Sequence, residues 1–116
     1  MSRRSDIANR YALMQLRTAT HPRIVWMMHS RAALWIRQSA LFEMPHRRNL
    51  LARAQNLLAE LESSLKVTDD LSRGLFYLYD YCYLLLETND PRDHLLALRV
   101  MSILGDAFGI LLKRLR

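Results

Sequence analysis

Apolar residues recur three and four positions apart through most of the chain, the spacing that lines one face of an α-helix. Four long stretches of this kind are separated by only a few residues, so sequential helices are expected to run antiparallel. The pattern predicts helices near residues 22–43, 46–66, 69–88 and 91–114, after a short helix in residues 1–20. The expected fold is all-α, an antiparallel up-down-up-down four-helix bundle with a short N-terminal helix.

Residues at the proposed boundaries support this division. Pro22 and Pro91 suit the first turn of a helix, where the missing N–H has no intrahelical partner. Residues 68–70 and Asp90 supply oxygen acceptors that can cap the helices following them. We expect residues 1–116 to form a single domain, with residues 1–20 as a lead-in segment and residues 21–116 as the bundle.

Composition agrees with one helical domain. The chain has 116 residues, of which 51% are hydrophobic and 24% charged, and only three glycines and three prolines, too few turn formers for a sandwich or barrel. A single cysteine excludes an internal disulfide framework. No uninterrupted apolar run approaches ~18 residues, and the N-terminus lacks the apolar core of a secretory signal. These features predict a cytoplasmic protein without a transmembrane helix.

The third predicted long helix is apolar nearly all round, since Asp80 is the only charged residue between Leu75 and Leu86. Its apolar residues fall into three stripes: Leu71, Leu75, Leu78, Cys82 and Leu85; Phe76, Tyr79, Tyr83 and Leu86; and Tyr77, Tyr81 and Leu84. One stripe suffices to face a bundle core. The apolar residues beyond one stripe form either additional core or the lining of an outer groove for a partner. The fourth long helix has the same surplus of apolar residues.

Residues that could carry catalysis do not converge. The four histidines form no i, i+4 pair, and the three glycines are isolated within helical stretches. Cys82 is expected to be a buried, inert thiol. Asp80 is better explained as a partner for a tyrosine hydroxyl or a backbone group than as a catalytic acid. We therefore predict no catalytic residue, no metal ligand and no cofactor.

The charge balance permits other partners. Lys and Arg total 17 against 11 Asp and Glu, giving a net charge of +6. A basic chain can bind nucleic acid, but the arginines are scattered and the apolar third helix offers no recognition surface. Two alternatives remain open: a small basic helical nucleic-acid-binding protein, and a homodimer whose interface takes up the apolar surplus.

Three stretches resemble the FliS family, the flagellar secretion chaperones that bind flagellin. The first is Tyr11 followed by TATHPRIVWMMHSRAALWI at residues 18–36, where the family has a Thr-Ala-Ser/Thr-Pro turn and a Met-Leu-Tyr-Asp/Asn-Gly run. The second is LARAQNLLAEL at residues 51–61, and the third is LYDYCYLLLETND at residues 78–90. This chain departs from the family pattern at residues 27–31, which read Met-Met-His-Ser-Arg, and in the position of Pro22.

The resemblance implies an export chaperone rather than an enzyme. Family members hold the disordered C-terminal segment of flagellin, keep it monomeric in the cytoplasm and deliver it to the flagellar export apparatus. The implied partners are that segment, or a related exported protein, and the export apparatus, with neither nucleic acid nor membrane insertion expected. Self-association stays open.

The resemblance also places Tyr11 and Met14 of the lead-in over the apolar groove as a removable cover, the alternative being a fixed staple. From helical spacing, we expect the groove on the outward faces of the second, third and fourth long helices. The candidate residues there are Leu57, Leu61, Tyr77, Tyr81, Leu98 and Ile110.

Overall fold

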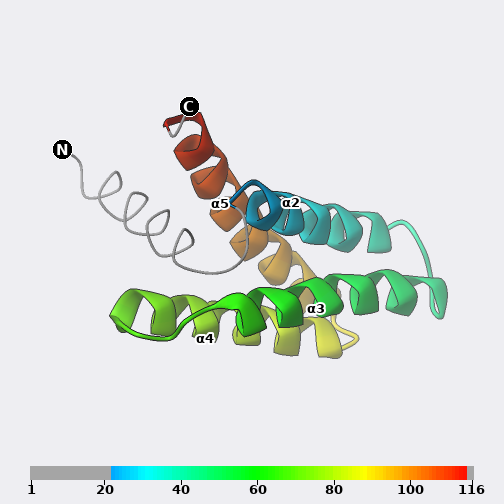
Figure 1. Cartoon of the computed structure of the whole chain (residues 1–116). Coiled ribbons are helices and arrows are strands. Elements are labelled where there is room, and N and C mark those ends of the chain that lie inside the picture. The colour runs from blue at the N-terminus through cyan, green and yellow to red at the C-terminus, as the bar shows by residue number, and fades with distance from the viewer. Residues whose placement is uncertain (1–21, 115–116) are drawn as a thin grey trace.

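The computed structural model describes residues 22–114, and in them it contains four α-helices and no strand (Figure 1). The helices are α2 (Pro22–Ser39), α3 (His46–Ser64), α4 (Asp70–Glu87) and α5 (Pro91–Arg114). This confirms the predicted all-α class and the four long helices. The short helix predicted in residues 1–20 lies outside the described residues.

The helices form a ring in chain order. Each packs against the next, α5 closes the ring against α2, and the two diagonal pairs do not pack closely. In Figure 1, α3 and α4 run side by side in opposite directions, while α5 slants away from them toward its C-terminal end. The short connections therefore produce the antiparallel order that the sequence predicts.

Helix α2 ends at Ser39, whereas the sequence predicts that it continues to residue 43. The Ser39 hydroxyl donates to the Ile36 carbonyl oxygen at 2.6 Å, and the Ser39 carbonyl accepts from Nε of Arg47 at 3.1 Å. These bonds satisfy groups at the end of α2 and join them to the start of α3. Phe42, which follows the end of α2, is exposed, and its ring meets the His46 ring edge-on.

The predicted caps are present. At the start of α4, Asp69 accepts from the Ser72 N–H at 2.8 Å, and the Ser72 hydroxyl accepts from the Asp69 N–H at 3.1 Å, which makes a capping box. At the start of α5, the Asp90 carboxylate accepts from the Arg92 N–H at 2.9 Å. Each bond satisfies a donor that the helix itself leaves unpaired.

A buried polar pair lies where α2, α4 and α5 meet. His29 donates from Nδ1 to the Val25 carbonyl oxygen at 2.8 Å, so Nε2 of the neutral ring accepts from the Tyr79 hydroxyl, also at 2.8 Å. The His29 ring also stacks on Phe108, with centroids 6.0 Å apart. Burial lowers the pKa of His29 to about 4, so the ring is neutral at physiological pH.

Two glycines allow α2 and α5 to approach each other. A Cβ atom at Gly105 would lie 3.5 Å from Cβ of His29, and one at Gly109 would lie 3.0 Å from Nε1 of Trp26. The second distance is shorter than side chains normally allow, because the indole ring fills the space that a methyl group would need. The glycines in α5 thus serve close helix packing.

Candidate partner-binding surface

Helix α4 has one buried face and one exposed face, and both are apolar. The buried residues include Leu75, Tyr79, Cys82 and Leu86. The opposite side carries Tyr77, Tyr81 and Leu84, which are 63%, 46% and 57% exposed and are called here the tyrosine face. Of the three stripes in the sequence, Tyr77, Tyr81 and Leu84 form the one that packing leaves in solvent.

Helix α5 repeats this arrangement. Ala97, Met101 and Phe108 are fully buried, whereas Leu96, Ile103 and Ile110 are exposed. The last three, spaced seven residues apart, are called here the α5 stripe. Within residues 22–114, the apolar surplus of the two helices therefore includes a large exposed surface, and additional core does not account for all of it.

Tyr77, Tyr81 and Ile110 lie on the surface, as predicted from spacing. Leu61 does not, because it is 1% exposed and belongs to the core. Its placement on an outward face was wrong: Leu51, Ala54, Leu58 and Leu61 recur three and four residues apart and lie on the inward face of α3.

Leu57 and Leu98 are half-buried and pack against the core. Leu98 follows Leu96 by two residues, a rotation of about 200° around the helix, so it lies on the far side of α5 from the α5 stripe. The predicted residues thus do not share one groove. Tyr11 and Met14 fall outside the described residues.

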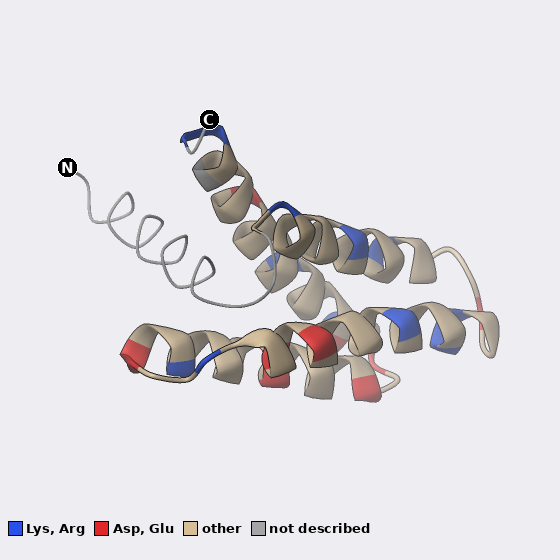
Figure 2. Cartoon of the chain, viewed as in Figure 1, with Lys and Arg blue, Asp and Glu red and all other residues tan. Residues whose placement is uncertain are grey.

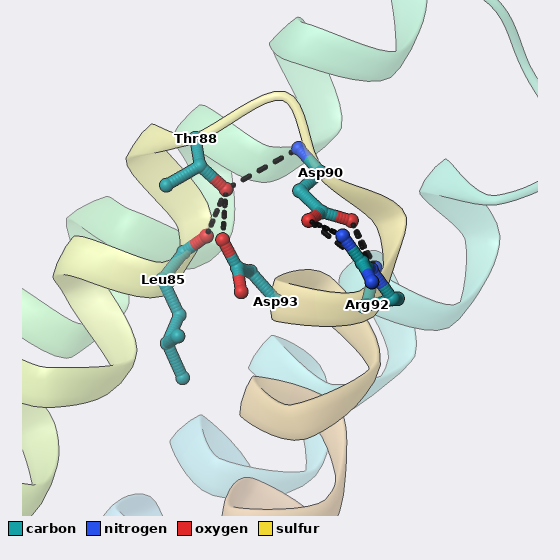
Figure 3. Close-up of polar contacts among 5 residues, drawn as sticks. All are labelled: Leu85, Thr88, Asp90, Arg92 and Asp93. Atoms are coloured by element: carbon teal, nitrogen blue, oxygen red, sulfur yellow. Dashed lines mark hydrogen bonds and ion pairs between the residues drawn. The ribbon is translucent and has the colours of Figure 1, made fainter.

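The turn between α4 and α5 contains a cluster of polar contacts (Figure 3). The Thr88 hydroxyl accepts from the Asp90 N–H at 3.3 Å and lies 2.7 Å from the Asp93 carboxylate and 3.1 Å from the Leu85 carbonyl oxygen. The Asp90 carboxylate also pairs with the Arg92 guanidinium at 3.0 Å. That hydrogen bond lowers the pKa of Asp90. The turn is thus held by its own short polar side chains.

Arg48, at the start of α3, holds the C-terminal end of α4. Its guanidinium donates to the carbonyl oxygens of Leu86 at 2.6 Å and Thr88 at 3.0 Å, and to the side-chain oxygen of Asn89 at 2.9 Å. A cation placed on unpaired carbonyls also complements the negative end of the helix dipole. No local signal in the sequence indicates this contact, because its partners lie 38 to 41 positions away along the chain.

Two further groups bear on possible chemistry. Cys82 is buried, and burial raises the pKa of its thiol to about 12, so it is the inert thiol that the sequence predicts. Glu62 on α3 has one carboxylate oxygen covered, and the pKa of Glu62 is raised by this desolvation and then by the charge of Asp80. Asp80 itself is exposed on α4.

Other ligand classes find little support in the described part of the chain. Between residues 22 and 114, no three His, Cys, Asp or Glu side chains gather in a way that could hold a metal ion. Lys and Arg occur on all four helices, and Asp and Glu lie among them on α3, α4 and α5 (Figure 2). By length and composition alone, α5 could cross a membrane, a test that core helices of soluble proteins also pass. The expectation of no such helix rested on uninterrupted runs, which Arg99 and Asp106 break here.

A small helical bundle with an extensive apolar outer surface belongs to the class of protein-binding modules. The family model described as "Flagellar protein FliS" matches residues 4–107. The chain therefore belongs to the FliS family, a family of soluble cytoplasmic flagellar export chaperones rather than enzymes. No curated protein and no solved structure matches the chain.

Proposed function

We propose that this chain binds the C-terminal segment of flagellin, or of a related exported protein, and keeps it from polymerising before export. The observation that carries the proposal is the tyrosine face, an exposed apolar surface on a helix whose opposite side already fills the core. Membership of the FliS family supports the class of client.

The chemistry of the tyrosine face suits a client of this kind. A segment destined for filament contacts has an apolar side that would self-associate, and an apolar surface can cover it in a helix-in-groove interaction. Tyrosine presents a large apolar ring and a hydroxyl that tolerates water, so Tyr77 and Tyr81 can stay exposed until a client arrives. A client that orders on binding loses conformational entropy, which keeps the complex dissociable.

The test is calorimetric titration with the C-terminal segment of the flagellin from the same organism. The double variant Tyr77→Ala/Tyr81→Ala should bind at least about tenfold more weakly, because large aromatic side chains commonly supply most of the binding energy at an interface. Its melting temperature should stay close to that of the unchanged protein, since both side chains are largely exposed.

Two controls make the result specific. Leu34→Ala changes an exposed apolar residue on α2 and should leave client affinity unchanged. Leu61→Ala removes a core side chain and should cost about 2–5 kcal/mol of unfolding free energy. Unchanged client affinity in the double tyrosine variant would exclude the tyrosine face as the client site.

A further inference from the structure

The α5 stripe forms a straight apolar line on the outside of the molecule. Leu96, Ile103 and Ile110 are exposed by 39%, 66% and 50%, and successive members are seven residues apart. Seven residues are nearly two helical turns, so the three side chains share one face and span about 21 Å. Met101 and Phe108, on the buried side of the same helix, already hold α5 in the bundle.

Two exposed residues of opposite charge flank this line on one side. Arg99 precedes Ile103 by four residues, and Asp106 follows it by three. Both positions lie on the same flank of the stripe, because steps of three and four residues return to nearly the same side of a helix. Ile103 is thus the centre of a nearly symmetric arrangement on α5. On each side of it, a charged residue lies three or four positions away and an apolar residue lies seven positions away. The two charged residues, Arg99 and Asp106, are opposite in sign.

We propose that α5 pairs antiparallel with α5 of a second copy of this chain, about a two-fold axis at Ile103. In this pairing Leu96 lies opposite the partner's Ile110, and Ile103 meets the partner's Ile103. The same patch serves both copies, as an interface with two-fold symmetry requires.

Charge complementarity fixes the direction of the pairing. Antiparallel packing brings the same flank of both helices together, so Arg99 lies within one residue, about 1.5 Å along the axis, of the partner's Asp106. The contact occurs twice by symmetry. A parallel pair would place Arg99 level with the partner's Arg99, so the attraction between Arg99 and the partner's Asp106 would be lost. Arg92, which lies level with the basic end of the partner's helix, is already paired with Asp90.

The pairing uses a surface different from the tyrosine face and does not rest on the proposed function. Three aliphatic side chains from each copy make a small interface, which predicts a concentration-dependent dimer with a dissociation constant in roughly the micromolar range. The two surfaces can therefore be tested separately in one protein.

Sedimentation equilibrium of the full chain, over about 1 to 200 μM, tests the proposal directly. Ile103→Arg should raise the dissociation constant at least about tenfold, because it places two like charges at the centre of an apolar contact. Leu34→Arg, at an exposed apolar position on α2, is the matched control and should leave the mass unchanged. Tyr77→Ala/Tyr81→Ala should likewise keep the dimer.

Charge exchange tests the direction. Arg99→Asp and Asp106→Arg should each weaken the dimer about five- to tenfold, since each replaces two attractive contacts by repulsive ones. The double variant with both changes should regain the original affinity. An equimolar mixture of the two single variants should form a one-to-one heterodimer, because every flank contact is then attractive again.

The opposite outcomes overturn the proposal. A monomer at every concentration excludes self-pairing, and binding of that monomer to anionic lipid vesicles, lost in Ile103→Arg, would make a membrane the occupant. A dimer unaffected by Ile103→Arg would place the interface elsewhere. Charge variants that weaken the dimer but are rescued neither in the double variant nor in the mixture would exclude the antiparallel register. Circular dichroism of each variant checks the fold, and the charge variants change only exposed side chains.

Discussion

At the scale of single residues, His29 is a fully buried polar side chain that packs among apolar core residues. It lies on α2, and Nε2 of its ring accepts a hydrogen bond from the Tyr79 hydroxyl on α4. A neutral histidine with both nitrogens bonded can be buried at little cost. A charged one would leave its desolvation uncompensated, which is why burial depresses the pKa of His29.

This environment predicts acid sensitivity. The pKa of His29 is about 4 in the folded chain against an ordinary 6.5, so the unfolded chain takes up the proton first as the pH falls. The contribution to stability is complete above pH 6.5 and is lost progressively toward pH 4, to a total of about 3 kcal/mol. Urea unfolding at a series of pH values measures it.

The matched control is the double variant His29→Phe/Tyr79→Phe, which keeps two aromatic rings and removes both polar partners. Carboxylates that titrate in the same range act in both proteins, so the difference between them isolates His29. That difference should change between pH 6.5 and 4 and stay constant above pH 7. Equal losses of stability in the two proteins would show that His29 is not the acid-sensitive group.

At the scale of elements, the ends of the helices are fixed by two kinds of contact. Caps such as Asp69 and Asp90 act within a few residues of their own position and are visible in the sequence. The C-terminal end of α4 is held from another helix, by Arg48. A planar guanidinium with several donors can reach several carbonyl oxygens at once, which a lysine ammonium does less well.

Replacing Arg48 by Met should therefore lower the free energy of unfolding by about 1–3 kcal/mol, because several charge-assisted hydrogen bonds are lost while the aliphatic stem is kept. Urea unfolding at neutral pH is the measurement. Arg53→Met, an exposed arginine on the same helix, should change stability by less than about 0.5 kcal/mol. If both variants lose the same amount, general charge removal rather than the contact with α4 is responsible.

At the scale of the whole molecule, α4 and α5 each contribute one side to the core and leave an apolar side in solvent. The core is closed by the ring of four helices in residues 22–114. Stability therefore should not depend on the exposed apolar surfaces, and these surfaces are free to bind partners. We propose, from the resemblance of the lead-in to the FliS family, that Tyr11 and Met14 cover the client-binding surface until a client binds.

Deletion of residues 1–17 tests the cover. The shortened chain should keep its helical circular dichroism and a cooperative thermal transition, and it should bind the flagellin segment more tightly, because no competing segment has to leave. Calorimetry with the same segment measures the gain. A shortened chain that fails to fold would instead identify the lead-in as a fixed staple.

The four long helices in residues 22–114, their starts and the fold class could be predicted because they depend on local signals. Apolar periodicity over 15 to 25 residues and caps such as Asp69 act within one segment, whatever the segment packs against. The end of α2 was missed by four residues since Ser39 is bonded to Arg47, in the next helix. The family could also be predicted from the sequence, because the motifs that indicate it are stretches of consecutive residues.

The sequence by itself thus determined the helices, the bundle class and the family. Only the tertiary structure decided which of the apolar stripes of α4 is buried, because apolar residues lie nearly all round this helix. Packing against α3 and α5 turns Tyr79 inward and leaves Tyr77 and Tyr81 outside, and it buries Leu61. Partners 50 and 38 residues away give His29 and Arg48 their roles, and such distances leave no trace in local spacing.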